Sequence, residues 1–126
     1  MRFRILTCAL SIVGTAAVAD EPAKEAFEAR TVSDIVSLCS ASEDSDTGKY
    51  AIGFCYGWLR GVDEFYDALL ADERFNVRAV ACPGREVSPG ETRQLFVDWA
   101  TSTTGAMEMA ALPGLIRAAK EIFPCP

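Results

Sequence analysis

Residues 53–66 read GFCYGWLRGVDEFY, a helical pattern that contains glycine at every fourth position over its first nine residues. Gly53, Gly57 and Gly61 fall inside a helix predicted over 49–70, where each glycine costs roughly 1 kcal/mol relative to alanine. A glycine inside a helix usually has a packing reason, so we expect a second element to approach this side of the helix closely.

The predicted helix has three distinct sides when its residues are placed on a helical wheel at about 100° per residue. Apolar side chains, Trp58 and Phe65 among them, fill one continuous arc, and charged side chains occupy the opposite side. The glycines lie at the border and leave a shallow channel free of side chains. We expect a neighbouring helix of the same chain to fill this channel. In the alternative, another copy of the chain or a binding partner lies there, and charged residues beside the channel fix its register. The candidate interface residues are Gly53, Gly57, Arg60, Gly61 and Glu64.

Residues 1–19 are predicted to be a cleavable signal peptide rather than part of the fold. Two early arginines precede an uncharged apolar stretch over 5–17, and AVA at 17–19 provides a small-x-small cleavage site. This stretch is shorter than the about 20 apolar residues that span a bilayer, so we expect no membrane anchor after cleavage. The sequence therefore predicts an exported protein with one mature helical domain over 20–126, in which 20–30 form a loose arm.

The cysteines agree with export to an oxidising compartment. One of the five leaves with the signal peptide, and the remaining even set predicts two disulfides. Wide spacings, the lack of a CxxC pair and the lack of histidine in the sequence disfavour a zinc site. In an up-down bundle the pairs would be Cys39–Cys55 at one end and Cys82–Cys125 at the other, although the connection over 71–87 is long enough to bring Cys82 to Cys55.

Other start and stop signals predict an all-α fold, a small disulfide-linked helical bundle of four to five helices. Residues 31–40 begin with a T-x-x-D start signal, and SPGE (88–91) is typical of a capping box with proline at the first helical position. Asp46 or Thr47 is expected to cap the long central helix. The last helical stretch, from Met107 onward, contains a Pro-Gly pair and should be kinked or divided.

Charge and residue types disfavour several classes of function. Removing the two leader arginines from 12 basic residues leaves 10 against 18 acidic residues, a net charge of −8. Such a surface repels phosphate backbones, so we expect no nucleic-acid partner. The negative charge would suit a basic protein partner. Alternatively, it serves only to keep an exported protein in solution. The acidic group Asp63-Glu64 with Asp67 is typical of a solvated helix face, and no phosphate loop or G-x-S-x-G turn occurs. We expect no enzyme, no catalytic residue, no cofactor and no metal, and we favour a binding role.

Five short motifs follow one another along the chain: LC (38–39), GFCYGWxxG (53–61), ACP (81–83), SxxxxRQL (88–95) and FPC (123–125). In this order they resemble the Rap/Tai-type immunity proteins of the bacterial type VI secretion system. The resemblance covers nearly all of the mature chain, and GFCYG and FPC are its most specific parts.

The resemblance implies a small helical periplasmic protein, often dimeric, that binds a peptidoglycan amidase injected by a neighbouring cell and occludes its catalytic cleft. No effector-contact residue carries over individually. The candidates are the loops over 71–81 and 101–105, with the glycine channel as a homodimer seam. The chain departs from the family pattern at 101–111, which lacks a His-Pro pair, and at Pro113.

Two other functions are consistent with the same residues. An acid-stress chaperone similar to HdeA would expose apolar surface when its carboxylates are neutralised, and would suppress client aggregation near about pH 2. An envelope scaffold or assembly factor would act without any toxin partner. A gene position beside a secreted amidase would separate the immunity function from the scaffold function.

Overall fold

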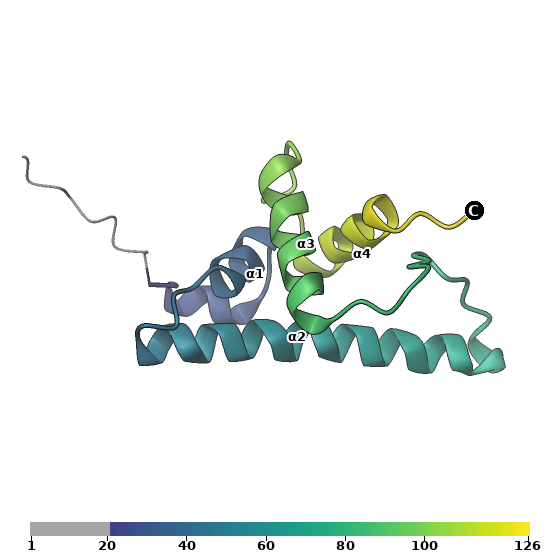
Figure 1. Cartoon of the computed structure of the whole chain (residues 1–126), viewed down its shortest axis with the longest axis horizontal. Helices are drawn as coiled ribbons and strands as arrows, with labels where there is room; N and C mark the ends of the chain where they lie inside the picture. Colours follow the sequence, from purple (N-terminus) through teal and green to yellow (C-terminus); the bar gives the residue numbers. More distant parts are fainter. Residues whose placement is uncertain (1–20) are drawn as a thin grey trace, which may run out of the picture.

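The computed structural model describes residues 21–126, and within that range the chain is helical and contains no strand (Figure 1). The all-α prediction is confirmed, whereas the predicted signal peptide over 1–19 lies outside the described residues. Among residues 21–126, no helix combines the length and apolar character needed to cross a bilayer. The α-helices are α1 (Val32–Cys39), α2 (Asp46–Ala71), α3 (Pro89–Ser102) and α4 (Ala111–Ile122), and the 3-10 helices are η1 (Lys24–Glu28) and η2 (Glu73–Phe75).

Helix α2 is the long base of the molecule (Figure 1). Helices α1 and α3 pack directly on it, and α4 packs on α1 and α3. The buried residues of α2 all lie between Gly48 and Leu59, so the second half of the helix extends past the core. Ser45 caps its start by accepting a hydrogen bond from Gly48 N at 3.0 Å, which corrects the expectation that Asp46 or Thr47 is the cap.

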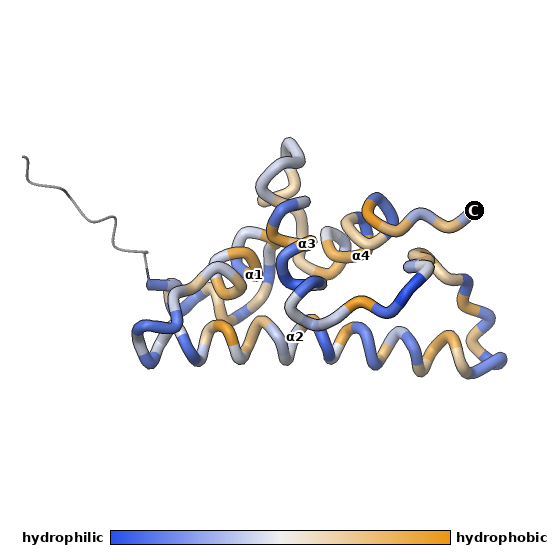
Figure 2. Tube along the Cα trace, viewed as in Figure 1, coloured by the Kyte–Doolittle hydropathy of each residue, from blue (hydrophilic) through white to orange (hydrophobic). Residues whose placement is uncertain are grey.

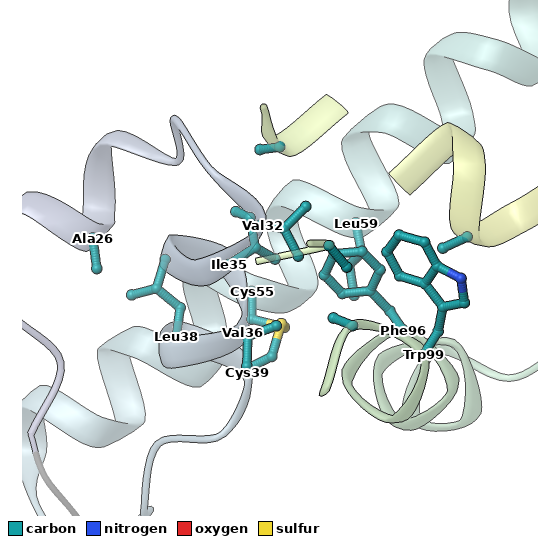
Figure 3. Packing of buried hydrophobic residues seen from close by; sticks show 14 of the residues in the cluster. Ala26, Val32, Ile35, Val36, Leu38, Cys39, Cys55, Leu59, Phe96 and Trp99 are labelled. Atoms are coloured by element: carbon teal, nitrogen blue, oxygen red, sulfur yellow. A yellow bond between two sulfur atoms is a disulfide. The ribbon is translucent and has the colours of Figure 1, made fainter. Parts of the chain in front are cut away.

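The core lies between the first half of α2 and the other three helices (Figure 3). Phe96 of α3 is 1% exposed, and Ile35 and Leu38 of α1 are fully buried. Burial of each such side chain contributes about 1.5–3 kcal/mol. The Cys39–Cys55 disulfide joins α1 to α2 inside this cluster, and Cys82–Cys125 joins the segment before α3 to the chain end. These are the two pairs expected from an up-down arrangement.

Local capping explains where two helices begin. Thr31 Oγ1 accepts from Asp34 N at 3.2 Å, and Thr31 N donates to Asp34 Oδ2 at 2.9 Å, so the capping box predicted for α1 is complete. At α3, Ser88 Oγ accepts from Glu91 N at 3.2 Å. The carboxylate of Glu91 binds Arg85 instead of Ser88 N, so this predicted box is only half formed.

Residues 20–30 were expected to form a loose arm because of their charge, and for the described residues 21–30 that expectation is wrong. Residues 24–28 form η1, which buries Ala26 and packs on α1. Phe27 meets Phe54 of α2 edge to face, with ring centroids 5.6 Å apart. These two contacts outweigh the charged composition and hold the segment against the start of α2.

Helix α4 begins later than predicted, at Ala111, and it is neither kinked nor divided within 111–122. The residues before it pair with the chain around Thr31: Val32 N donates to Met109 O at 2.9 Å, and Ser33 N donates to Met107 O at 3.0 Å. Pro113 therefore lies in the first helical turn, where a missing N–H costs no intrahelical bond. The Pro-Gly pair starts the helix rather than breaking it.

Candidate partner-binding surfaces

Gly53, Gly57 and Gly61 of α2 face away from the core, and this overturns the expectation that a neighbouring helix of the chain fills their channel. A Cβ added at Gly53, Gly57 or Gly61 would meet no atom within 4 Å anywhere in the part of the chain that the structure describes. The reason is the packing direction, because α1 and α3 lie on the opposite side of α2. The channel is an open surface.

Two exposed aromatic side chains extend this surface at its ends. Tyr50 is 74% exposed and Phe65 is 66% exposed. At about 100° per residue Tyr50 lies among the glycines, and Phe65 lies at the border between the glycines and the apolar arc. We call Tyr50, Gly53, Gly57, Gly61 and Phe65 the glycine seam. Arg60 and Glu64 form an exposed ion pair one turn apart along its border.

Phe65 was expected on the buried side of α2, and that expectation is wrong. The core ends at Leu59, so the apolar arc of the helix continues for three turns with little to cover it. Figure 2 shows apolar residues continuing along α2 beyond the point where α3 crosses it. The overhanging half of α2 is therefore a second place where apolar surface remains open.

The connection after α2 has an ordered tip. We call residues 72–82 the distal arm. The Arg74 guanidinium donates to the Asp72 carboxylate, and Arg74 N donates to it at 3.0 Å. These hydrogen bonds, chiefly those of the guanidinium, hold the pKa of the Asp72 carboxyl below its ordinary value. Asn76 has φ 48°, a left-handed conformation that Asn tolerates and that ends η2. Between them Phe75 is 57% exposed, so the arm presents an aromatic ring on a defined turn.

The far side of the distal arm is tied to the body at three points. The Tyr66 hydroxyl accepts from Val80 N at 2.6 Å and donates to Arg78 O at 3.2 Å. Cys82 N donates to Phe123 O at 2.8 Å, and Cys82 is bonded to Cys125. The arm thus leaves the end of α2 and returns to the end of α4, as Figure 1 shows.

The acidic group on α2 borders a small hollow. Partial burial raises the pKa of the Asp63 carboxyl, Asp67 and Glu64 raise it further, and Arg60 opposes them. The hollow holds about 50 Å³ and is lined by α2 and the residues around Pro89. A second hollow between α3 and α4 is of similar size. Small-molecule sites occupy about 300–1,000 Å³, so neither hollow has the size of a substrate pocket. Among residues 21–126 no group of His, Cys, Asp and Glu is placed to hold a metal ion.

Of the two candidate loops, only one carries a side chain suited to anchor a partner. Residues 101–105 contain threonine, serine and glycine, and α3 continues through the first two of them to Ser102. Gly105 has φ 74°, which favours glycine in the turn that follows. The distal arm instead offers Phe75, and aromatic residues are enriched at interface centres. The sequence predicted the loop over 71–81 as a candidate surface but did not single out Phe75. An aromatic residue in a polar segment without helical periodicity could have indicated it.

A carboxylate on α4 provides a test of the α3–α4 packing. Glu121 Oε2 accepts from Trp99 Nε1 at 2.6 Å, and Arg117 Nε binds Oε1 at 2.8 Å. Both hydrogen bonds lower the pKa of the Glu121 carboxyl, and the bond from Trp99 has the larger effect. The pKa of this carboxyl is therefore lower in the folded chain than in the unfolded chain. Its hydrogen bonds contribute fully to stability at pH values above the pKa of the unfolded chain, and this contribution is lost as the pH falls through the pKa of the folded chain.

We therefore expect Trp99 fluorescence to change at a pH below the ordinary glutamate range. The measurement is a titration from about pH 7 to about pH 2 in a Trp58→Phe background. Glu121→Gln is the matched control and should remove the transition. A transition that persists in the Glu121→Gln variant would show that Glu121 does not cause it.

Comparison with known proteins gives one finding. A family model described as Rap1a immunity proteins matches residues 31–125, from the cap of α1 to the last cysteine. No curated protein matches, and no solved structure matches.

Proposed function

The chain belongs to the Rap1a immunity protein family, and from this membership we propose that it is a periplasmic protein that binds a secreted peptidoglycan amidase and occludes its catalytic cleft. The observation that carries the proposal is the distal arm, which projects past the core and presents Phe75 on an ordered turn. A convex, rigid aromatic tip suits a concave enzyme cleft. Occlusion needs only such a surface and no reactive group.

Preorganisation supports this use of the arm. Asp72 and Arg74 fix its tip, and Tyr66 with the Cys82–Cys125 disulfide fixes its return. Association loses about 0.5–1.5 kcal/mol for each rotamer-rich side chain that binding immobilises, and a segment already ordered avoids part of that loss. The acidic excess of the chain without its two leader arginines, 18 acidic against 10 basic residues, would in addition steer a basic enzyme toward it.

The test is inhibition of a defined enzyme. We expect the purified chain, cut after residue 19, to form a stoichiometric complex with a secreted amidase encoded beside it and to stop that amidase from digesting peptidoglycan. An amidase that remains active in the complex, or a chain that binds none of the neighbouring amidases, would overturn the proposal. Protection of an unrelated client at about pH 2 would favour the acid-chaperone function instead.

We further propose that the glycine seam joins two copies of the chain across a two-fold axis near Gly57. A two-fold interface must be self-complementary, and the seam is nearly symmetric in sequence. Gly53 and Gly61 lie four residues to either side of Gly57, Tyr50 lies seven before it, and Phe65 lies eight after it. In an antiparallel pair Tyr50 of one copy would therefore lie across from Phe65 of the other, and the glycines of the two copies would face each other between these rings.

Gly57→Leu tests the seam. We expect this variant to sediment as a monomer, because the leucine side chain prevents close approach of two helices. The monomer itself should gain stability, because nothing in the chain meets a Cβ at this position and glycine costs a helix about 0.8–1.0 kcal/mol. Gly90→Leu, outside the seam, is the control for association. A wild-type chain that is monomeric at high micromolar concentration would contradict the seam proposal.

A further inference from the structure

The two disulfides differ in their access to solvent. Cys39 is 1% exposed and Cys55 is 0% exposed, and both lie inside the core cluster (Figure 3). Cys82 and Cys125 are both exposed, the second of them one residue from the chain end. A reductant can therefore reach the Cys82–Cys125 bond without any opening of the core, whereas the Cys39–Cys55 bond requires α1 and α2 to separate.

The exposed disulfide is also the main covalent constraint on the distal arm. Without it, the return of the arm depends on the Tyr66 hydroxyl bonds to residues 78 and 80 and on the single bond from Cys82 N to Phe123 O. All of these atoms lie at the surface or are only partly buried, where a hydrogen bond contributes about 0.5–1.5 kcal/mol. No residue from Asp72 to Glu86 is fully buried, so little packing would hold the segment in place.

We propose that reduction of the Cys82–Cys125 disulfide releases the distal arm from α4. A thiolate of a dithiol reductant attacks one of the two sulfurs, forms a mixed disulfide with it and displaces the other as a thiolate. The second thiol of the reductant then attacks the mixed disulfide, so the reductant leaves as a disulfide and both cysteines are thiols. Two electrons pass from the reductant to the protein. The arm detaches from α4 while Cys39–Cys55 keeps the core intact.

The order of thiol release is the first test and needs no effector. The oxidised chain is treated with limiting dithiothreitol under native conditions, alkylated at intervals, and analysed as peptides by mass spectrometry. We expect Cys82 and Cys125 to be alkylated at least tenfold faster than Cys39 and Cys55. Simultaneous appearance of all four thiols, or earlier appearance of Cys39 and Cys55, would overturn the proposal.

Release of the arm is the second test. Arg74, Arg78 and Arg85 are exposed trypsin sites in or next to the arm, and Arg60 on α2 is an internal reference. In a variant carrying both Cys82→Ser and Cys125→Ser, we expect cleavage after Arg78 and Arg85 at least tenfold faster than in the wild type, with cleavage after Arg60 unchanged. Equal cleavage of the two chains would show that the disulfide does not hold the arm.

The consequence for partner binding rests on the proposed function. If the arm contacts the amidase, selective reduction should weaken the complex at least tenfold, and reoxidation should restore it. The two ideas fail separately. If the thiols appear in the expected order but the chain binds no amidase, the release of the arm by reduction stands and the proposed immunity function is wrong. If the chain binds the amidase equally well before and after reduction, the arm is not part of the interface.

Discussion

Gly48→Ala is expected to destabilise the domain by about 3 kcal/mol or more, at the upper end of the cost of overpacking. Gly48 is buried in the first turn of α2, and a Cβ there would overlap the carbonyl oxygen and carbon of Ser42. Both are backbone atoms, so no side-chain rotation can relieve the overlap. Either the chain around Ser42 or the start of α2 must move, and the Ser45 cap would be lost with it.

Gly53→Ala is the matched control, because it adds the same methyl group to the same helix one and a half turns later. No atom lies within 4 Å of that added Cβ, so we expect a gain of about 0.5–1 kcal/mol from helix propensity alone. The measurement is urea unfolding followed by circular dichroism, at protein concentrations where the chain is monomeric. Two variants with equal stability would contradict the packing of residues 42–48 against α2.

The opposite signs expected for these two glycines show what could be predicted from the sequence. Helix starts at Thr31 and Ser88 were predictable because a cap depends on residues three apart, which are visible along the chain. The disulfide pairs were predictable once the helices were ordered. The caps use residues close in the sequence, whereas the disulfides join cysteines 16 and 43 residues apart and could be paired only by assuming an up-down order of the helices.

The direction of the glycine channel was not predictable, because a helical wheel separates faces without saying which face the rest of the chain covers. Gly53 and Gly57 are open, whereas a Cβ at Gly114 of α4 would overlap the Val32 side chain. At Gly114 the close approach of α4 to α1 does require glycine. In the sequence, the Pro-Gly pair that contains Gly114 indicated only a kink or a break in the last helix. The wheel also places Phe65 with the buried residues, because it contains no information about where the core ends.

A single aromatic truncation separates the two candidate surfaces. We expect Phe75→Ala to weaken the complex with the amidase by about 2–4 kcal/mol, or roughly 30-fold to 1,000-fold, as for a central anchor residue. The free energy of unfolding should change by no more than about 0.5 kcal/mol, because Phe75 is 57% exposed and contributes little to the core. The measurements are isothermal titration calorimetry for affinity and urea unfolding for stability.

Leu112→Ala is the matched control, since Leu112 is an apolar side chain 46% exposed on α4, outside both the distal arm and the glycine seam. Its affinity for the amidase should stay within about threefold of the wild type, because truncation of a residue outside an interface leaves the contacts unchanged. If Phe75→Ala binds as the wild type does and Phe65→Ala does not, the amidase contacts the seam instead. One surface would then serve both the second copy and the enzyme, so the dimer would have to separate before the complex forms. The apparent affinity per chain would then fall as the chain becomes more concentrated, because a smaller fraction of it is monomeric. An apparent affinity that is independent of chain concentration, together with the loss at Phe75, is the result that assigns the arm to the enzyme and leaves the seam to the dimer.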